Sequence, residues 1–284
     1  MNNTQPILKW AGGKRKLAPL ISDIVKYDLE NVTNYVEPFF GGGAVFFELY
    51  KNNSIKSATI NDIVPQLVNF YKTLSESNNV KAIHSSTVNK LKYFNSLKDS
   101  KKRKKYFYYL RDSFNDLWSD ENRSTKTHNE HPEYLSIEDS FKSTVLLYVI
   151  NKTCFNGLFR VNSKGFYNVP LGSYEKIQIP SYTYFKNVAN ALSNVDVNYG
   201  DYEVILKNSL GKQNTFIYLD PPYVANSNTS DFTSYSKEKF KDSSSEDSEH
   251  IRLSENFDEM VDAGAKIILS NHNNPKAHSI FVEG

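Results

Sequence analysis

Compact apolar runs alternate with stretches of helical periodicity toward both ends of the 284-residue chain. Each run is short and rich in Val, Ile, Leu, Tyr or Phe, which is typical of buried strands. The predicted strands are residues 35–37, 57–60, 195–199, 215–219 and 265–269. The predicted helices are residues 44–50, 64–74, 140–150 and 254–263, with another ending at 189–192, and residues 226–249 are predicted to form a loop. This alternation predicts an α/β protein with a doubly wound, mostly parallel sheet.

The middle of the chain does not follow this alternation. Residues 76–136 are polar, charged and only weakly periodic. Residues 154–172 are rich in Gly, Asn and aromatic side chains, and they are interpreted as loop and hairpin. We therefore expect residues 76–189 to form a helical and hairpin domain, inserted into a sheet domain that consists of residues 1–75 and 190–284.

Composition narrows the class of protein. With 18 Phe and 19 Tyr, the chain can bury a sizeable core, which argues against disorder. Its one cysteine, Cys154, excludes an intramolecular disulfide and a zinc site built from cysteines. The first ten residues lack the basic and apolar regions of a signal peptide, and no run approaches 18 apolar residues. We therefore expect a protein of the reducing cytoplasm, with no membrane span.

Positive charge is concentrated in the middle third of the chain. Residues 81–180 carry 17 Lys or Arg against 10 Asp or Glu, compared with 8 against 7 before them and 9 against 15 after them. Within this third, the basic run Lys101–Lys105 leads directly into the aromatic run Tyr106–Tyr109. Such a sequence suits nucleic acid, which offers phosphates and stackable bases. It also suits a helix around residues 104–118 with a buried aromatic face on a solvated, lysine-rich surface.

The first predicted strand ends at Glu37 in a glycine-rich turn. Phe39 precedes Gly41 and Gly43, and a predicted helix follows. Glycines let the backbone approach a ligand closely, and a helix N-terminus offers free N–H groups. Asp62, 19 residues after Gly43, ends the next strand, where an acid commonly accepts hydrogen bonds from ribose hydroxyls. This pattern indicates an adenosine-containing cofactor, and two purely structural turns are the alternative.

The strand at residues 215–219 ends in Asp220, Pro221, Pro222 and Tyr223. This is the edge at which open sheets hold their active sites. The prolines stiffen the turn and lack N–H donors, so the turn presents acceptors. The Asp carboxylate and a Pro carbonyl can accept both hydrogens of one planar amine, which localises its lone pair, while the Tyr ring can stack a planar base. The motif therefore favours alkylation of an aromatic exocyclic amine over a simple rigid turn.

A third candidate motif lies near the N-terminus, at residues 9–15. Its Gly-Gly-Lys lacks the spacing of a phosphate-binding loop, and Arg15 stands where that loop has Ser or Thr, so nucleotide triphosphate hydrolysis is excluded. Trp10 and Lys14 beside glycines suit the edge of a cofactor site. An exposed N-terminal turn is the alternative.

Taken in order, these motifs make the chain similar to the Dam-type family of DNA adenine N6-methyltransferases, the D12 class, from residue 6 to about residue 275. The segments that carry the resemblance are residues 9–14, 36–44, 61–62, 151–162, 166–172, 220–223 and 269–272. The order of cofactor motif, recognition region and catalytic motif is also that of the family. The resemblance implies a Rossmann-like methyltransferase fold with an inserted DNA-recognition domain.

The resemblance implies S-adenosylmethionine as the cofactor and no metal. The residues that it assigns to the cofactor are Trp10, Lys14, Glu37, Phe39, Gly41, Gly43, Asp62 and Asp220. The target adenine would leave the duplex, because its N6 is otherwise paired. Asp220 and the Pro221 carbonyl would then hold N6, Tyr223 would stack on the base, and Pro222 completes the catalytic motif.

The resemblance also implies a recognition hairpin for double-stranded DNA. The expected contacts are Phe155, Asn156, Arg160, Asn162 and Pro170. Arg160 matches the family's guanine-reading arginine, a two-pronged donor suited to O6 and N7, and Phe155 matches an aromatic that wedges into the base stack. These matches imply a GATC target. A surface arginine in a salt bridge and a core phenylalanine of the hairpin are the alternatives.

Other functions fit parts of the pattern. They are a remnant that binds GATC without methylating it, and a methyltransferase for another planar amine such as cytosine N4 or an RNA base. In the resembled family, a helix and an antiparallel strand pair follow the Ser270-Asn271-His272 segment, so we expect an open sheet edge near the end of this chain. We expect a monomer, with a companion restriction endonuclease as a further candidate partner.

Overall fold

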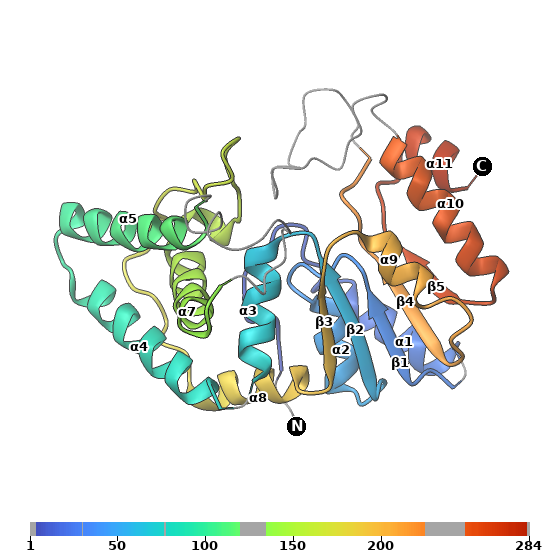
Figure 1. The fold of residues 1–284 in the computed structure, drawn as a ribbon, viewed down its shortest axis with the longest axis horizontal. Helices are drawn as coiled ribbons and strands as arrows, with labels where there is room; N and C mark the ends of the chain where they lie inside the picture. The colour runs from blue at the N-terminus through green and yellow to red at the C-terminus, as the bar shows by residue number, and fades with distance from the viewer. Residues whose placement is uncertain (1–3, 30, 77, 120–134, 225–247, 283–284) are drawn as a thin grey trace.

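The computed structural model describes residues 4–29, 31–76, 78–119, 135–224 and 248–282 (Figure 1). A five-stranded parallel sheet forms its centre, with the strand order β3-β2-β1-β4-β5. The strands are β1 (Asn34–Glu37), β2 (Ser57–Asp62), β3 (Val195–Tyr199), β4 (Thr215–Leu219) and β5 (Lys266–Leu269). All five strands predicted from the sequence are confirmed. Because the order reverses at β1, the carboxyl ends of β1 and β4 border the point at which such sheets bind ligands.

Each face of the sheet carries its own apolar core, so the predicted doubly wound arrangement is confirmed. Tyr35, Phe216 and Tyr218 point to one face, whereas Ile217 and Leu219 point to the other. The helices on the first face are α1 (Ala18–Tyr27), α2 (Ala44–Lys51), α3 (Pro65–Ser75) and α8 (Tyr182–Leu192). The helices on the second face are α9 (Tyr202–Lys207), α10 (Ser248–Asp262) and α11 (Pro275–Phe281).

Between β2 and β3 the chain leaves the sheet, as expected from the weakly periodic middle of the sequence. The helices of this region are α4 (Val80–Ser96), α5 (Ser100–Leu117) and α7 (Ile137–Thr153), on the left in Figure 1. Every residue of α7 from Ser143 to Asn151 is buried. The buried side chains of these helices are continuous with the core on the first face of the sheet.

The sequence pattern does not predict α4. The buried positions of this helix are Val80, Ile83, Thr87, Leu91 and Phe94, which are three or four residues apart as in any amphipathic helix. The apolar periodicity of α4 is weak because Thr87 occupies the middle buried position and the outer face is polar. The short helices α9 and α11, and α1 near the N-terminus, are likewise not predicted.

A long polar segment separates β4 from α10. Residues 225–247 lie outside the described residues, and they include nearly all of the loop predicted at 226–249. The next described element, α10, begins at Ser248. Across the described ranges, none of the helices combines the length and the apolar character needed to span a bilayer.

Candidate active site and recognition segment

The predicted site residues meet at the carboxyl edge of the sheet. Glu37 and Asp62 are the last residues of β1 and β2, and Asp220 follows β4 directly. Parallel strands end at the same edge, so three carboxyl groups far apart in the sequence are brought to neighbouring positions. Asn271 reaches the same edge from the end of β5.

The glycine turn after β1 is packed against Asp62 and Trp10. The Gly41 N–H donates to Oδ2 of Asp62 over 2.8 Å. Gly41 and Gly43 have φ angles of +49° and +67°, in the left-handed region that favours glycine. A Cβ on Gly41 would lie 2.8 Å from Cδ1 of Trp10, so the indole ring needs this glycine to approach the turn. The structure thus brings together Trp10, Gly41, Gly43 and Asp62, as the sequence predicts.

Asp62 is held firmly by the backbone. Its Oδ1 accepts a hydrogen bond of 2.9 Å from the N–H of Val64, while Oδ2 accepts from Gly41. Burial raises the pKa of the Asp62 carboxyl to about 6, and the backbone N–H groups oppose this shift. The carboxyl therefore has a fixed position, and ionises less readily than an exposed aspartate.

Asn61 ties three strand ends together, a role that sequence reasoning missed. Its Nδ2 donates to the carbonyls of Pro38 and Gly200, both over 3.0 Å. These carbonyls follow β1 and β3, so the amide cross-links the edge on both sides of β2. Its Oδ1 is buried and has no hydrogen-bond partner in the described part of the chain. A donor from a bound ligand would satisfy this atom.

Glu37 lies beneath the turn and is 3% exposed. Its Oε2 accepts a hydrogen bond of 2.8 Å from the hydroxyl of Tyr35. Burial raises the pKa of Glu37 well above its ordinary value, so the neutral acid is favoured. Phe39, two residues further, packs its ring against Tyr202 at a centroid distance of 5.0 Å. Both residues are thus engaged by the protein at the point where the sequence predicts cofactor contacts.

Lys14 and Asp220 form an ion pair at the catalytic motif. The Lys14 ammonium lies 2.7 Å from each oxygen of the Asp220 carboxylate and 4.8 Å from the centre of the Tyr223 ring. Burial raises the pKa of Asp220, and the charge of Lys14 opposes this shift. Burial also works against the charge on Lys14, but Asp220 and Tyr223 outweigh it and raise the pKa of Lys14. The sequence places both residues at the site but does not predict that they pair.

The segment after β5 braces the catalytic motif. Asn271 Oδ1 accepts from the N–H of Val224 over 3.0 Å, and Nδ1 of His272 lies 3.0 Å from the Val224 carbonyl. The ring of His272 meets the ring of Tyr223 edge-on, at a centroid distance of 4.7 Å. Because β5 is the parallel neighbour of β4, polar residues at its carboxyl end were the available signal for this role.

The five predicted DNA contacts lie on an irregular segment whose side chains alternate. Phe155, Asn156, Arg160, Asn162 and Pro170 are all exposed, Phe155 to 48%. The residues between them that fix the segment are Phe159, Val161, Tyr167 and Val169, all buried. Two isolated antiparallel bridges, Cys154 with Leu171 and Val161 with Tyr167, hold its two arms together. The expected loop and hairpin is confirmed.

Two of these exposed side chains have partners within the segment. Nε of Arg160 donates to Oδ1 of Asn168 over 2.8 Å, and within the described ranges no carboxylate pairs with this arginine. Oδ1 of Asn162 accepts from the N–H groups of Lys164 and Phe166, so it stabilises the tip of the hairpin. Asn162 thus has a structural role beside the predicted one.

The N-terminal segment connects the recognition segment to the glycine turn. The side chain of Asn151, on α7, accepts from the N–H of Lys9 over 2.9 Å and donates to the Lys9 carbonyl over 2.8 Å. It also donates to the Gly157 carbonyl over 3.1 Å. Next along the chain, Trp10 stacks on Phe159 at a centroid distance of 5.2 Å. Asn151 belongs to the segment 151–162 that carries the resemblance, but the sequence does not predict this contact, because Lys9 is 142 residues away.

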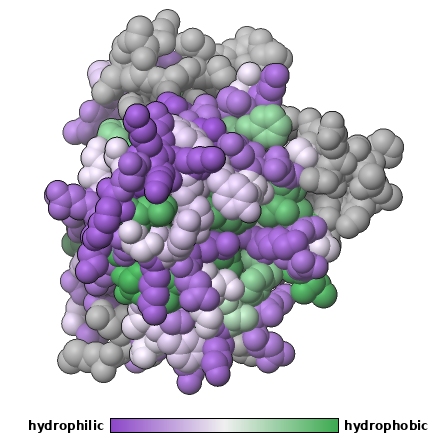
Figure 2. All heavy atoms as spheres, turned by 90° about the vertical axis from the view of Figure 1, so that its left-hand side faces the viewer, coloured by the Kyte–Doolittle hydropathy of each residue, from purple (hydrophilic) through white to green (hydrophobic). Residues whose placement is uncertain are grey.

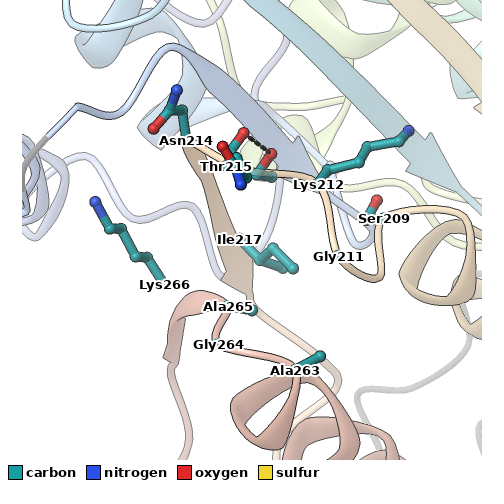
Figure 3. Close-up of a pocket in the computed structure, with 11 residues that line it drawn as sticks. Ser209, Gly211, Lys212, Asn214, Thr215, Ile217, Ala263, Gly264, Ala265 and Lys266 are labelled. Atoms are coloured by element: carbon teal, nitrogen blue, oxygen red, sulfur yellow. Dashed lines mark hydrogen bonds between the residues drawn. The ribbon is translucent and has the colours of Figure 1, made fainter.

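A small cavity lies at the opposite edge of the sheet (Figure 3). It has a volume of about 100 Å³ and is lined by residues 209, 211–215, 217 and 263–266, around the starts of β4 and β5. Lys212 and Lys266 extend in opposite directions from it, so their charges do not converge. None of the predicted site residues lines this cavity. Among the described residues, no group of three or more His, Cys, Asp or Glu is arranged to hold a metal ion.

Comparison with known proteins agrees with this geometry. A scan against protein-family models matches residues 10–283 to the D12 class N6 adenine-specific DNA methyltransferases. The chain is 36% identical to the type II methyltransferase M.MjaIII of Methanocaldococcus jannaschii, over 99% of this chain and 88% of that protein. It is 32% identical to the type II methyltransferase M1.LlaDCHI of Lactococcus lactis subsp. cremoris, over 98% and 85%. It is 31% identical to a DNA adenine methylase of Vibrio cholerae, over 84% and 73%. The chain therefore belongs to the family of D12 class N6 adenine-specific DNA methyltransferases.

Proposed function

We propose that this enzyme transfers the methyl group of S-adenosylmethionine to N6 of an adenine in GATC, after that adenine has left the duplex. One observation carries the proposal. The carboxylate of Asp220 and the ring of Tyr223 converge on a single nitrogen, the Lys14 ammonium, at 2.7 Å and 4.8 Å. A flipped adenine stacked on Tyr223 would place its N6 in the same surroundings.

The residues of this pocket suit attack by an aromatic amine. The Asp220 carboxylate and the Pro221 carbonyl accept hydrogen bonds from N6, Pro222 keeps the turn rigid, and Tyr223 holds the base by stacking. Bound S-adenosylmethionine would supply the methyl carbon to N6, its sulfur would keep the electron pair of the broken C–S bond, and one N6 proton would pass to water. Asp220 stabilises the positive charge that develops on N6, so the rate gain comes from positioning and from a fixed acceptor.

The glycine turn and its neighbours suit the cofactor. Methyltransferases of this family use S-adenosylmethionine, which supplies an electrophilic methyl group when bound. Asp62 is fixed at the end of β2, where it could accept from ribose hydroxyls, and Asn61 Oδ1 is a buried acceptor beside it. The predicted contacts of Trp10, Lys14, Glu37 and Phe39 with the cofactor remain proposals.

We assign DNA recognition to the inserted region, residues 76–189. Its exposed hairpin side chains would read the duplex, while α5 would contact phosphates. The basic run forms the first turns of α5, where Lys101 and Lys104 are exposed. Lys104 and Arg111 both lie over the ring of Tyr108. Figure 2 shows the face to which α4 and α5 contribute, covered largely by hydrophilic side chains. We expect the enzyme to act as a monomer, whether or not a companion restriction endonuclease exists.

The deciding experiment is methyl transfer from radiolabelled S-adenosylmethionine to a duplex that contains one GATC site. Its control is the same duplex with the target adenine replaced. Label on the first duplex alone is expected. Equal label on both duplexes would contradict the GATC assignment, and label on neither, with duplex binding retained, would favour a binding remnant.

Replacing Arg160 by alanine is expected to relax discrimination at one guanine of the target. A bidentate arginine–guanine contact contributes about 1–3 kcal/mol, so the preference for that base should fall by about 5-fold to 150-fold. The measurement compares kcat/KM on the GATC duplex and on duplexes substituted at each base pair. Lys164→Ala, at the exposed tip of the same hairpin, is the control. Unchanged discrimination in Arg160→Ala would return this residue to a structural role.

Neutralising two lysines of α5 is expected to weaken the salt dependence of duplex binding without changing sequence preference. Removing one phosphate contact reduces the slope of log affinity against log salt by about 0.9. Lys101→Gln with Lys104→Gln should therefore reduce it by about 1.8. Lys26→Gln with Lys56→Gln removes the same charge from exposed positions outside the insertion. Equal slopes for both double variants would exclude α5 from the DNA interface.

A further inference from the structure

We propose that Lys14 is a positioning residue that occupies the place of the target amine, orients the Asp220 carboxylate before substrate arrives, and withdraws when the amine enters. The inference rests on the proposed function, because it assumes that an aromatic amine binds between Asp220 and Tyr223. It gives Lys14 a role distinct from the cofactor contact expected from the sequence.

One nitrogen, the Lys14 ammonium, lies between the Asp220 carboxylate and the Tyr223 ring. The Lys14 ammonium is within 2.7 Å of both Asp220 oxygens and lies over the Tyr223 ring. The side chains of Lys14 and Asp220 are 15% and 19% exposed, so the contact is largely enclosed. An exocyclic amine bound to the same carboxylate and stacked on the same ring would need the volume that the ammonium fills. The two donors would therefore compete for this position, and we expect the lysine to move when the base binds.

The lysine can leave without a change of fold. The Lys14 backbone is fixed at the start of α1, because its carbonyl accepts from the N–H groups of Leu17 and Ala18. The side chain alone has to rotate. From its present position Nζ also donates to the exposed carbonyl of Gly12 over 2.6 Å, so Asp220 is not its only acceptor.

Lys14 is the group that favours the ionised form of Asp220 before the amine binds. The ionisable groups that face Asp220 are Tyr35 and Glu37 on β1, Tyr218 on β4, Tyr223 after it and Lys14 before α1. In the described part of the chain, Lys14 is the one cation of this set. His272 packs on Tyr223 from the β5 side. Without Lys14, burial would favour a protonated Asp220, which cannot accept from the amine as a carboxylate does.

The test compares the titration of Asp220 in the protein alone, by carboxyl-¹³C NMR, in the wild type and in Lys14→Met. Asp220→Asn identifies the resonance. The Asp220 midpoint is expected to move up by about 1 pH unit or more in Lys14→Met, because an opposite charge in contact usually lowers a carboxyl pKa by 1–3 units. Lys14→Arg keeps the positive charge, so the titration midpoint of Asp220 should remain nearly unchanged. Lys16→Met, an exposed neighbour, is the matched control.

A second measurement follows the base itself. A duplex with 2-aminopurine at the target position becomes more fluorescent when that base leaves the stack. Lys14→Met lacks the competing ammonium, so its fluorescence increase should occur at a lower protein concentration than that of the wild type. On the unmodified GATC duplex, the acid limb of kcat/KM, which reports the free enzyme, should move to higher pH in Lys14→Met and stay in place in Lys14→Arg. If Lys14→Met does not fold, Lys14→Gln takes its place in both measurements.

The outcomes separate the two claims. An Asp220 titration that coincides in Lys14→Met, Lys16→Met and the wild type would overturn the positioning role, even if the wild type methylates GATC. A wild type that folds and binds the duplex but transfers no methyl group would instead overturn the proposed function. The Asp220 titration would then still show whether Lys14 controls this carboxylate.

Discussion

Replacing Asp220 by alanine is expected to abolish methyl transfer while leaving duplex binding nearly intact. The carboxylate is the acceptor that would orient N6 and stabilise its developing charge, and removal of one such fixed group typically costs about 100-fold to 1000-fold in kcat. The side chain follows β4 at the carboxyl edge of the sheet and is not part of the hairpin. Single-turnover transfer and duplex affinity, measured on the same preparation, check the expectation.

Two further variants separate chemistry from folding. Asp220→Ala leaves the largely buried Lys14 ammonium without its partner, which also lowers stability. Asp220→Asn keeps the shape and one acceptor oxygen, so it should fold better yet remain strongly impaired. Asp196→Ala removes an exposed aspartate of β3 and should behave as the wild type. Turnover near the wild-type rate in Asp220→Asn would end the role of this carboxylate as the amine acceptor.

The second large effect is expected at Gly43, which begins α2. A Cβ there would lie 2.4 Å from Cζ of Phe40, whose ring is buried against Tyr71. Gly43→Ala places a side chain at a left-handed φ of +67°, which destabilises the fold by about 1–2 kcal/mol. Overpacking against Phe40 destabilises it by about 1–3 kcal/mol more. Because a domain is stable by only about 5–15 kcal/mol, thermal unfolding should begin at a clearly lower temperature. Calorimetry and cofactor binding measure the two consequences.

Gly211 supplies a matched control for that prediction. It has nearly the same φ, +69°, but a Cβ there would meet nothing within 4 Å. Gly211→Ala therefore carries the backbone strain without the clash. The difference in unfolding free energy between the two variants isolates the contact with Phe40. If both variants lose equal stability, the glycine turn does not depend on that contact.

Much of the sheet could be predicted because its signals are local. The run Thr215–Leu219 is apolar apart from its first residue and ends at an aspartate and two prolines, and the structure buries all five of its residues. The opposite case is α4, whose stripe passes through Thr87 and is stabilised by tertiary packing. Its neighbours in space, α7 and α8, lie far along the chain. No local pattern contains that information.

The candidate site divides in the same way. Asp62 and Asp220 could be predicted, because a residue that ends a parallel strand must lie at the functional edge of the sheet. The pairing of Lys14 with Asp220 joins residues 206 positions apart, and the hold of Asn151 on Lys9 joins residues 142 apart. Such contacts depend on how distant segments dock on one another, and the sequence of either segment alone does not specify it.

The alternation of side chains along the hairpin has a consequence for how this protein can change. Its inward residues, such as Phe159 and Tyr167, carry the packing, whereas Arg160 and Pro170 face outward and contribute little to the core. Substitutions at outward positions thus cost little folding free energy, since surface changes are usually within about 0.5 kcal/mol. New sequence preferences could therefore arise on this frame by single steps, each of which leaves a folded enzyme.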